Sequence, residues 1–253
     1  MRAMYLGILV CAAVGLVLAP AARGDWKEGM PYKMHWPQLP DPLGWDVQDV
    51  RLILADDFLC TETGPITDVH LWGSFQHDMG GVGLINNIHL SIHDNDVTGL
   101  FSKPGNLLWQ ADFGPNDFKI QQSGTGPQGW LDPSLPPPLP QDHWNIYQIN
   151  ITNIRNPFVQ EVDNVYWLDV QVTSLDSQFG WKTSRSDHFK DDAVWGMVPA
   201  DGPGGPTPIA WQPLEDPFTG ASLDMAFVIT PEPATMALLG LGAAGFLARR
   251  RRK

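Results

Sequence analysis

The sequence predicts an all-β protein whose main part is a single antiparallel β-sandwich or jelly-roll-like domain. Apolar and polar side chains alternate at a period of two over several stretches, which is the pattern of half-buried strands. Between residues 25 and 230, no stretch keeps the spacing of an amphipathic helix over an ordinary helix length. A chain of 253 residues has room for one such β domain between its two ends.

Individual strands are expected where the alternation is clearest. These stretches are 69–75, 88–92, 166–172 and 223–229. Turn residues cluster at 62–65, 112–116 and 201–206, and a proline-rich segment at 131–140 interrupts the pattern only briefly. We therefore expect roughly eight to ten short strands in a domain spanning 47–230, with 131–140 as a surface loop.

The N-terminal residues have the features of a secretory signal peptide. Met1-Arg2 is basic, residues 4–19 are apolar, and Ala22-Arg23-Gly24 carries small residues at a cleavage site. We expect signal peptidase to remove residues 1–24 by cutting before Asp25, with cleavage near 19–21 as the alternative. Residues 25–46 are rich in Pro and Trp without periodicity, so we expect an irregular N-terminal arm there.

The C-terminal residues 231–253 form a second signal. Pro231, Glu232 and Pro233 precede an uncharged segment of 15 residues, 234–248. As a short hydrophobic helix, this segment is about 22 Å long, which falls short of the ~30 Å hydrocarbon core of a bilayer. A basic tail follows, made of Arg249, Arg250, Arg251, Arg252 and Lys253, and the positive-inside rule places that tail in the cytoplasm.

The order of motif, short Gly-containing span and arginine tail resembles the PEP-CTERM sorting signal of exopolysaccharide-producing bacteria. The resemblance implies that an exosortase-type enzyme is a partner and removes the tail. It also implies a protein tethered in the membrane through this segment before delivery to the cell surface or extracellular matrix. A plain single-span anchor is the alternative.

Stretches of the body resemble a family of exported, PEP-CTERM-tailed bacterial β proteins of uncharacterised function. They are 55–60, 68–74, 179–184 and 191–195. This resemblance covers most of 30–230 and implies the fold and the location. It implies no site residues.

The body is strongly acidic. Residues 25–230 contain 9 Lys and Arg against 27 Asp and Glu, a difference of −18. Such a charge disfavours nucleic acid as a partner, because nucleic-acid affinity comes mainly from neutralising phosphates. Solubility outside the cell explains the acidity, and binding of divalent cations is the sharper alternative.

Two segments were considered as metal sites. His89 and His93 lie on an expected strand, where four residues span about 13 Å, too far for two ligands of one ion. We therefore expect both histidines on a solvent-exposed face of that strand. Residues 94–99 begin like a calcium loop, but Gly105 stands where an EF-hand needs a bidentate acid. We therefore assign no metal residue and no cofactor, and keep Ca²⁺ as an alternative.

No catalytic residue is assigned. The adjacent pairs Asp56-Asp57 and Asp191-Asp192 point to opposite faces of a strand, whereas glycosidases need two carboxyl groups about 5–9 Å apart. Asp187 and His188 are expected in a polar loop, with an acid/base cluster as the alternative. Cys60 is the only cysteine after residue 24, and a buried hydrophobic role is favoured over pairing between chains.

Tryptophan is abundant, with 11 residues in the chain. Trp72 and Trp167 alternate with the aliphatic residues of their strands. If that face is exposed, the two rings are platforms on which sugars can stack; if both faces are buried, they belong to the core, which we favour.

The sequence thus predicts an exported surface or matrix protein, non-enzymatic, structural or in contact with extracellular polysaccharide. A secreted polysaccharide-active hydrolase and a calcium-stabilised adhesion module are the alternatives.

Overall fold

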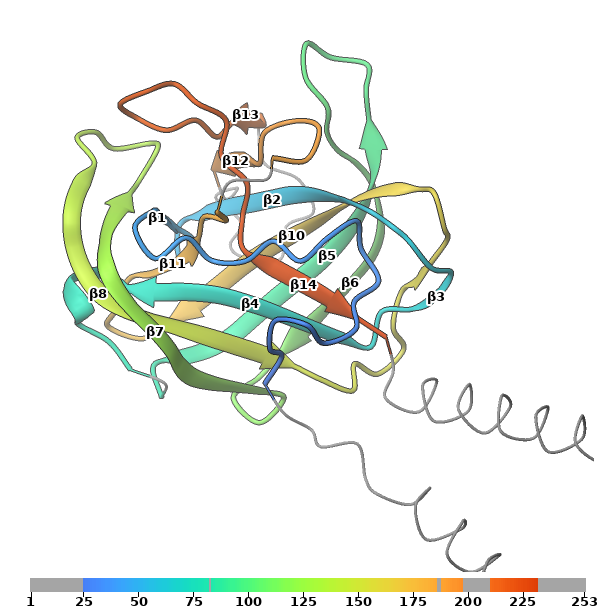
Figure 1. The fold of residues 1–253 in the computed structure, drawn as a ribbon, viewed down its shortest axis with the longest axis horizontal. Coiled ribbons are helices and arrows are strands. Elements are labelled where there is room, and N and C mark those ends of the chain that lie inside the picture. The colour runs from blue at the N-terminus through green and yellow to red at the C-terminus, as the bar shows by residue number, and fades with distance from the viewer. Residues whose placement is uncertain (1–24, 82, 186–187, 198–209, 232–253) are drawn as a thin grey trace, which may run out of the picture.

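The structure, a computed structural model, describes residues 25–81, 83–185, 188–197 and 210–231. These residues form fourteen strands and one short 3₁₀ helix (Figure 1). The all-β fold is therefore confirmed. The signal peptide and most of the sorting signal, with Glu232, Pro233 and the arginines, lie outside the described residues.

Two six-stranded sheets make up the body. The first, which we call the ring sheet, has the order β11 (Phe179–Lys182), β1 (Trp45–Gln48), β7 (Phe118–Leu131), β8 (Leu139–Ile151), β4 (Asp68–Phe75), β14 (Phe227–Thr230). The second sheet has the order β13 (Gln212–Pro213), β12 (Val194–Met197), β2 (Leu52–Leu59), β10 (Val165–Ser174), β5 (Ile85–Asp96), β6 (Lys103–Phe113). A small ladder joins β3 (Gly64–Pro65) to β9 (Val159–Gln160), and η1 (Gln76–Asp78) follows β4.

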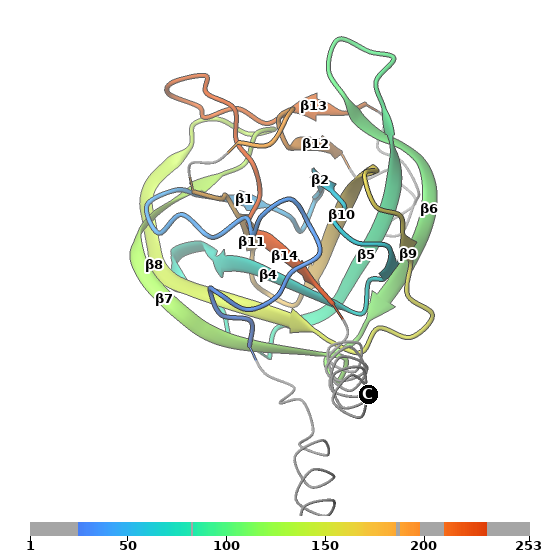
Figure 2. The ribbon, with the colours of Figure 1, turned by 45° about the vertical axis from the view of Figure 1, so that its right-hand side comes forward.

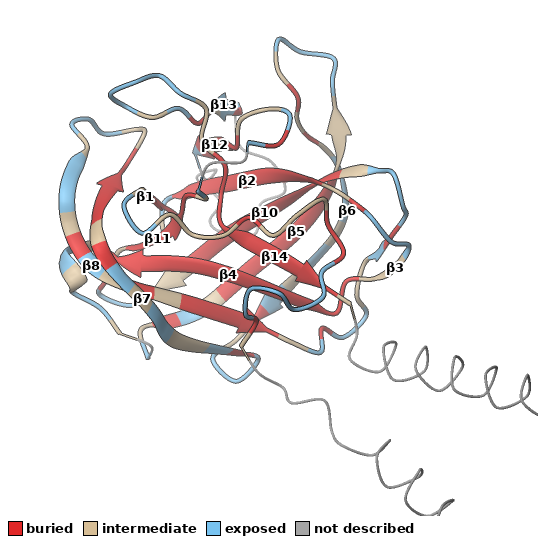
Figure 3. Ribbon diagram, in the orientation of Figure 1, coloured by how far each residue is buried: buried red, intermediate tan, exposed pale blue. Residues whose placement is uncertain are grey.

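The main hydrophobic core lies between the two sheets (Figure 3). It is built from the alternating apolar residues that predicted the strands. Leu71 and Ile149 come from the ring sheet, while Leu90 and Leu168 come from the second sheet, and all four side chains are buried. A sandwich follows, because each sheet buries one apolar face against the other.

The ring sheet closes on itself. β4 pairs with β8, β8 with β7, β7 with β1, β1 with β11, and β11 again with β4. Closure is possible because β14 and β11 share one edge of β4: β14 pairs with Asp68–Leu71 and β11 pairs with Gly73–Phe75. The β1–β7 ladder is the one parallel pairing among the described strands. We call the five strands β4, β8, β7, β1 and β11 the ring (Figure 2).

Gly73 allows β4 and β11 to approach closely within the ring. A Cβ atom at this position would lie 2.3 Å from the carbonyl oxygen of Gly180 and 2.3 Å from the ring of Phe179. We expect Gly73→Ala to lower the free energy of unfolding by about 1–3 kcal/mol, because backbone atoms cannot yield as a flexible side chain can. Urea unfolding measures the change. Gly83→Ala, where a Cβ meets nothing within 4 Å, is the control, and an equal loss in both variants would contradict the explanation.

The N-terminal arm lies across both sheets without forming a strand before Trp45. Isolated bridges join Met34 to Cys60 and Gln38 to Phe227. β1 begins inside the segment that we expected to be irregular, because its four residues are too few to show a period. The expected loop at 131–140 is the connection between β7 and β8.

Candidate functional site

All five ring strands contribute to a pocket of about 500 Å³ at one end of the ring. Gln48 ends β1, Gln76 follows β4, Trp130 lies near the end of β7, Leu139 begins β8, and Gln178 precedes β11. The remaining lining residues are Arg51, Asp132, Leu135 and Pro137. We call this the ring-mouth pocket. The mouth of a closed sheet is a common place for a ligand, because strand ends bring side chains from distant parts of the chain together.

Amide and charged side chains dominate the polar lining. Gln48 Nε2 donates to Gln178 Oε1 at 2.7 Å, while Gln48 Oε1 is buried without a hydrogen-bond partner. Arg51 Nη2 donates to Asp132 Oδ2 at 2.7 Å. The other oxygen of Asp132 accepts from the amide and the hydroxyl of Ser134, at 3.0 and 2.6 Å. The pocket thus has one satisfied ion pair and one unsatisfied amide group.

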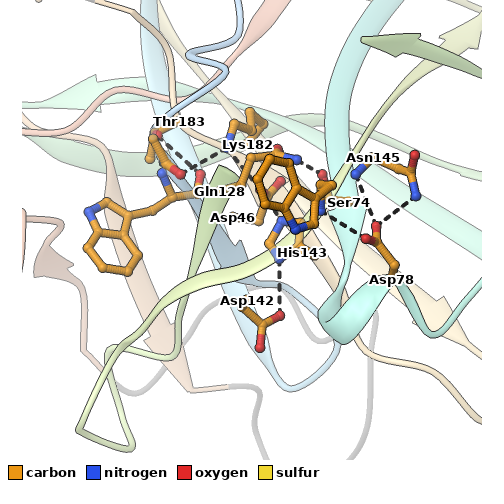
Figure 4. A network of polar contacts seen from close by, with 12 residues as sticks. Asp46, Ser74, Asp78, Gln128, Asp142, His143, Asn145, Lys182 and Thr183 are labelled. Carbon is orange, nitrogen blue, oxygen red and sulfur yellow. Dashed lines mark hydrogen bonds and ion pairs between the residues drawn. The ribbon is translucent and has the colours of Figure 1, made fainter. Parts of the chain in front are cut away.

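A network of buried charges lies in the interior of the ring (Figure 4). Lys182 Nζ donates to Asp46 Oδ2 at 2.9 Å, and His143 Nε2 donates to the same oxygen at 2.7 Å. The three side chains are completely buried and come from β11, β1 and β8. Asp46 and Lys182 face each other on the paired strands β1 and β11, and His143 reaches them from β8.

The network continues outward from His143. Its Nδ1 atom lies 3.1 Å from Asp142, and Asp142 in turn lies 2.6 Å from Nδ1 of the half-exposed His77. Burial opposes the charged form of His143, but the hydrogen bond and the charge of Asp46 outweigh it, so its pKa is raised. Burial lowers the pKa of Lys182, and Asp46 opposes that effect. Two acids and two bases thus balance one another when His143 is protonated.

Trp130 connects this network to the pocket. Its ring lines the pocket and meets the ring of His143 edge-on, with centroids 6.1 Å apart and planes at 79°. Ser74 Oγ donates to Gln128 Oε1 at 3.2 Å, also in the interior of the ring (Figure 4). The floor of the pocket is therefore fixed by packing and hydrogen bonds before any ligand arrives.

The structure places the two tryptophans that we considered for sugar stacking in cores. Trp167 is 0% exposed and packs with Val194 and Trp211 on the outer side of the second sheet. Trp72 is 5% exposed and meets Trp26 of the arm edge-on, beside a groove of about 490 Å³ between the arm and β7–β8. Neither ring offers an open face, so the core interpretation of both residues holds. Trp144, at 55%, is the one exposed tryptophan among the described residues.

The two expected solvent-facing histidines are buried. His89 Nδ1 lies 3.0 Å from Asp112, and His93 Nδ1 lies 3.2 Å from the carbonyl oxygen of Gly105. We expected an exposed face here, and that expectation was wrong, because both faces of β5 are covered. Within the described ranges, no group of three His, Cys, Asp or Glu side chains is arranged to hold a metal ion.

The carboxylates of residues 94–99 accept hydrogen bonds from their own loop and its neighbours. Asp94 accepts from the amide and side chain of Asn106, and Asp96 accepts from Thr98 and pairs with Lys103 at 3.3 Å. Asn95 accepts from the indole of Trp167 at 2.9 Å. These contacts explain the turn without an ion.

The carboxylates of residues 56–57 and 191–192 lie near Asp224, and among them Asp56, Asp57 and Asp224 are buried. Asp56 Oδ2 accepts from Gln38 and from the amide of Met225, at 2.8 and 2.7 Å. Asp57 is completely buried, and neither of its oxygens has a hydrogen-bond partner. Burial, with the charges of Asp224 and Asp191, raises the pKa of Asp57 to about 8.

His188 contacts Asp224 and Ser222 in an arrangement that only outwardly looks like a catalytic triad. Its Nδ1 atom lies 2.7 Å from Asp224, while its Nε2 atom faces the carbonyl oxygen of Lys190 at 3.1 Å. Ser222 Oγ lies at similar distances from both ring nitrogens, 3.2 and 3.1 Å, and hydrogen-bonds to Asp192. Because Nε2 donates to a carbonyl, it is not free to take a proton from Ser222. Asp187 lies outside the described residues.

Cys60 is fully buried, and burial raises the pKa of its thiol to about 12. Its backbone forms an isolated β-bridge with Met34 of the arm, and its side chain belongs to the main core. The structure therefore places Cys60 as a small buried hydrophobic residue.

An exported β-sandwich protein with a C-terminal sorting signal is the class that the fold and the tail define. Residues 230–252 match the PEP-CTERM protein-sorting motif, which supports export and sorting by an exosortase-type system. Residues 34–230 match the family described as Domain of unknown function (DUF7901), and the chain belongs to this family. Comparisons with curated proteins and with solved structures each gave no match. In the described part of the chain, no helix is long and apolar enough to cross a membrane.

Proposed function

We propose that this protein is a non-enzymatic module of the cell surface or extracellular matrix that contacts polysaccharide through the ring-mouth pocket. One observation carries the proposal: the ends of five strands bring three glutamines into one pocket beside a neutralised ion pair. Glutamine amides are among the few polar groups that fix the orientation of a ligand in a pocket.

A sugar suits this lining chemically. An amide side chain both donates and accepts hydrogen bonds, and so does every sugar hydroxyl. Gln76 and Gln178, which are partly exposed, offer such amides to the pocket. The exposed apolar side chains of Leu135 and Leu139 suit the C–H faces of a pyranose ring.

The lining favours binding over hydrolysis. Glycoside hydrolysis uses two carboxyl groups on either side of the scissile bond. The ring-mouth pocket contains one carboxylate, Asp132, and its oxygens are occupied by Arg51 and Ser134. The alternative of a hydrolase acting at this pocket therefore lacks its second group.

The pocket opens at the end of the sandwich opposite the sorting signal. β14 ends at Thr230, beside Asp68 at the start of β4, and Pro231 leads into the tail. The pocket lies beyond the other end of β4, at Gln76, about 25 Å away at the rise of a strand. Figure 1 shows β14 and β4 running in opposite directions, so the pocket and Pro231 lie at opposite ends of β4.

Glycan-array binding by the full-length chain, purified in detergent, tests the proposal. We expect selective binding to a set of polysaccharide fragments. We also expect Gln178→Ala to weaken binding about tenfold, the loss of one or two hydrogen bonds. The matched control is Gln122→Ala, because Gln122 is an exposed amide on β7 that bonds Asn145 at 2.8 Å away from the pocket. Absence of any binding, or equal losses in both variants, would overturn the proposal.

A further inference from the structure

We infer that the ring-mouth pocket takes an uncharged stretch of glycan rather than one bearing uronate or other acidic groups. This inference rests on the proposed function and specifies its ligand.

The only cation of the lining is already neutralised. Arg51 pairs with Asp132 at 2.7 Å, so the lining residues carry no net charge. A carboxylate entering the pocket would compete with Asp132 for the guanidinium. It would also lose water without gaining a free positive partner, which is costly.

The charges below the pocket leave no surplus positive charge either. Asp46 and Asp142 face Lys182 and His143 in the interior of the ring, two acids against two bases. Asp142 also contacts His77 at 2.6 Å, at the exposed end of the network. The buried cations beneath Trp130 are both paired with Asp46, so they offer an acidic sugar no free positive partner.

The amides and the body charge point the same way. The partly exposed amides of Gln76 and Gln178 can donate to a hydroxyl and accept from it, but they offer a carboxylate no positive charge. Beyond the pocket, the 27 acidic and 9 basic residues of 25–230 surround the ligand with a net charge of −18. This field slows the approach of a polyanion, particularly at low salt.

The test compares two panels of equal length, neutral hexose oligosaccharides and uronic-acid oligosaccharides, on the full-length chain in detergent. Each panel is measured in EDTA and in millimolar Ca²⁺. We expect neutral oligosaccharides to bind equally in both buffers and uronates to bind at least tenfold more weakly in both. Uronates binding as tightly as neutral sugars, or binding that appears only with Ca²⁺, would overturn the inference and leave the proposed function standing. No binding by either panel would overturn both.

A charge-changing variant sharpens this test. In Asp132→Asn, one oxygen still accepts from Ser134, but the charge that neutralises Arg51 is gone. We expect uronate binding to increase at least tenfold, while neutral binding stays within about threefold. The matched control is Asp176→Asn, which removes one exposed charge outside the pocket. Equal effects of the two substitutions on uronate binding would show that body charge, and not the Arg51 pair, excludes acids.

Discussion

Replacing Lys182 with Met lowers the free energy of unfolding by about 3–5 kcal/mol, the usual cost of removing one partner of a buried ion pair. Lys182 is completely buried and donates to Asp46 and to the carbonyl oxygen of Gly44, at 2.9 and 3.0 Å. Without the ammonium group, Asp46 keeps only His143 as a partner. The stem of Met fills nearly the same space, so the loss reports the charge rather than a cavity.

Urea unfolding of the full-length chain measures this effect. The control is Lys103→Met, because Lys103 forms a partly exposed pair with Asp96 at 3.3 Å, and such a pair contributes about 0.2–1 kcal/mol. Adding Asp46→Asn to Lys182→Met should restore part of the stability, since the unpaired carboxylate is then gone. Similar losses in the two single variants would show that the interior network does not hold the ring closed.

Raising the pH from 6.5 to 8.5 destabilises the protein, and Asp57→Asn removes part of this loss. The pKa of Asp57 is raised to about 8 by burial and neighbouring acids, and that of Asp169 to about 7 by burial. A raised pKa means that the folded chain holds a proton that the unfolded chain has released. The contribution of these two groups to the free energy of unfolding is therefore largest below pH 4, near their unfolded pKa. It is lost as the pH rises through the folded pKa.

Between its unfolded and its folded pKa, each such carboxyl group lowers the free energy of unfolding by about 1.4 kcal/mol per pH unit. His35, whose pKa burial lowers to about 3, has the opposite effect, but only below its ordinary value of 6.5. The interval above pH 6.5 therefore excludes His35. It still contains His143, whose raised pKa also makes stability fall with pH, so the comparison between Asp57→Asn and the native chain isolates Asp57. Thermal unfolding across that interval should give a shallower slope for Asp57→Asn than for the native chain. The exposed Asp163→Asn should keep the native slope; identical slopes for all three chains would refute the assignment to Asp57.

The strands of the sandwich could be predicted because their pattern is local. Alternation at 88–92 and 166–172 marks β5 and β10, which lie side by side in the second sheet with Leu90 opposite Val170. Closure of the ring could not be predicted. β1 and β11 have four residues each, and their pairing joins Asp46 to Lys182 across most of the domain.

The candidate site could not be predicted for a related reason. Gln48, Trp130 and Gln178 have no common spacing and converge because β11, β1 and β7, which are far apart in the sequence, are neighbours in the ring. Alternation alone could not decide between the core and sugar stacking for the two tryptophans. A period of two shows that Trp72 and Trp167 face away from the aliphatic residues, but it does not show that this second face is open. The arm covers Trp72, and Trp211 packs on Trp167.

The most direct test of the ring-mouth pocket is to locate the bound sugar on the protein. A photoactivatable oligosaccharide, chosen from the best binders of the array, is crosslinked to the full-length chain and mapped by mass spectrometry. We predict adducts on the peptides that carry residues 48–51, 130–139 and 178, and their loss in Gln48→Ala. Adducts confined to the groove beside Trp72, or to the exposed Trp144, would contradict the assignment of the pocket as the binding site.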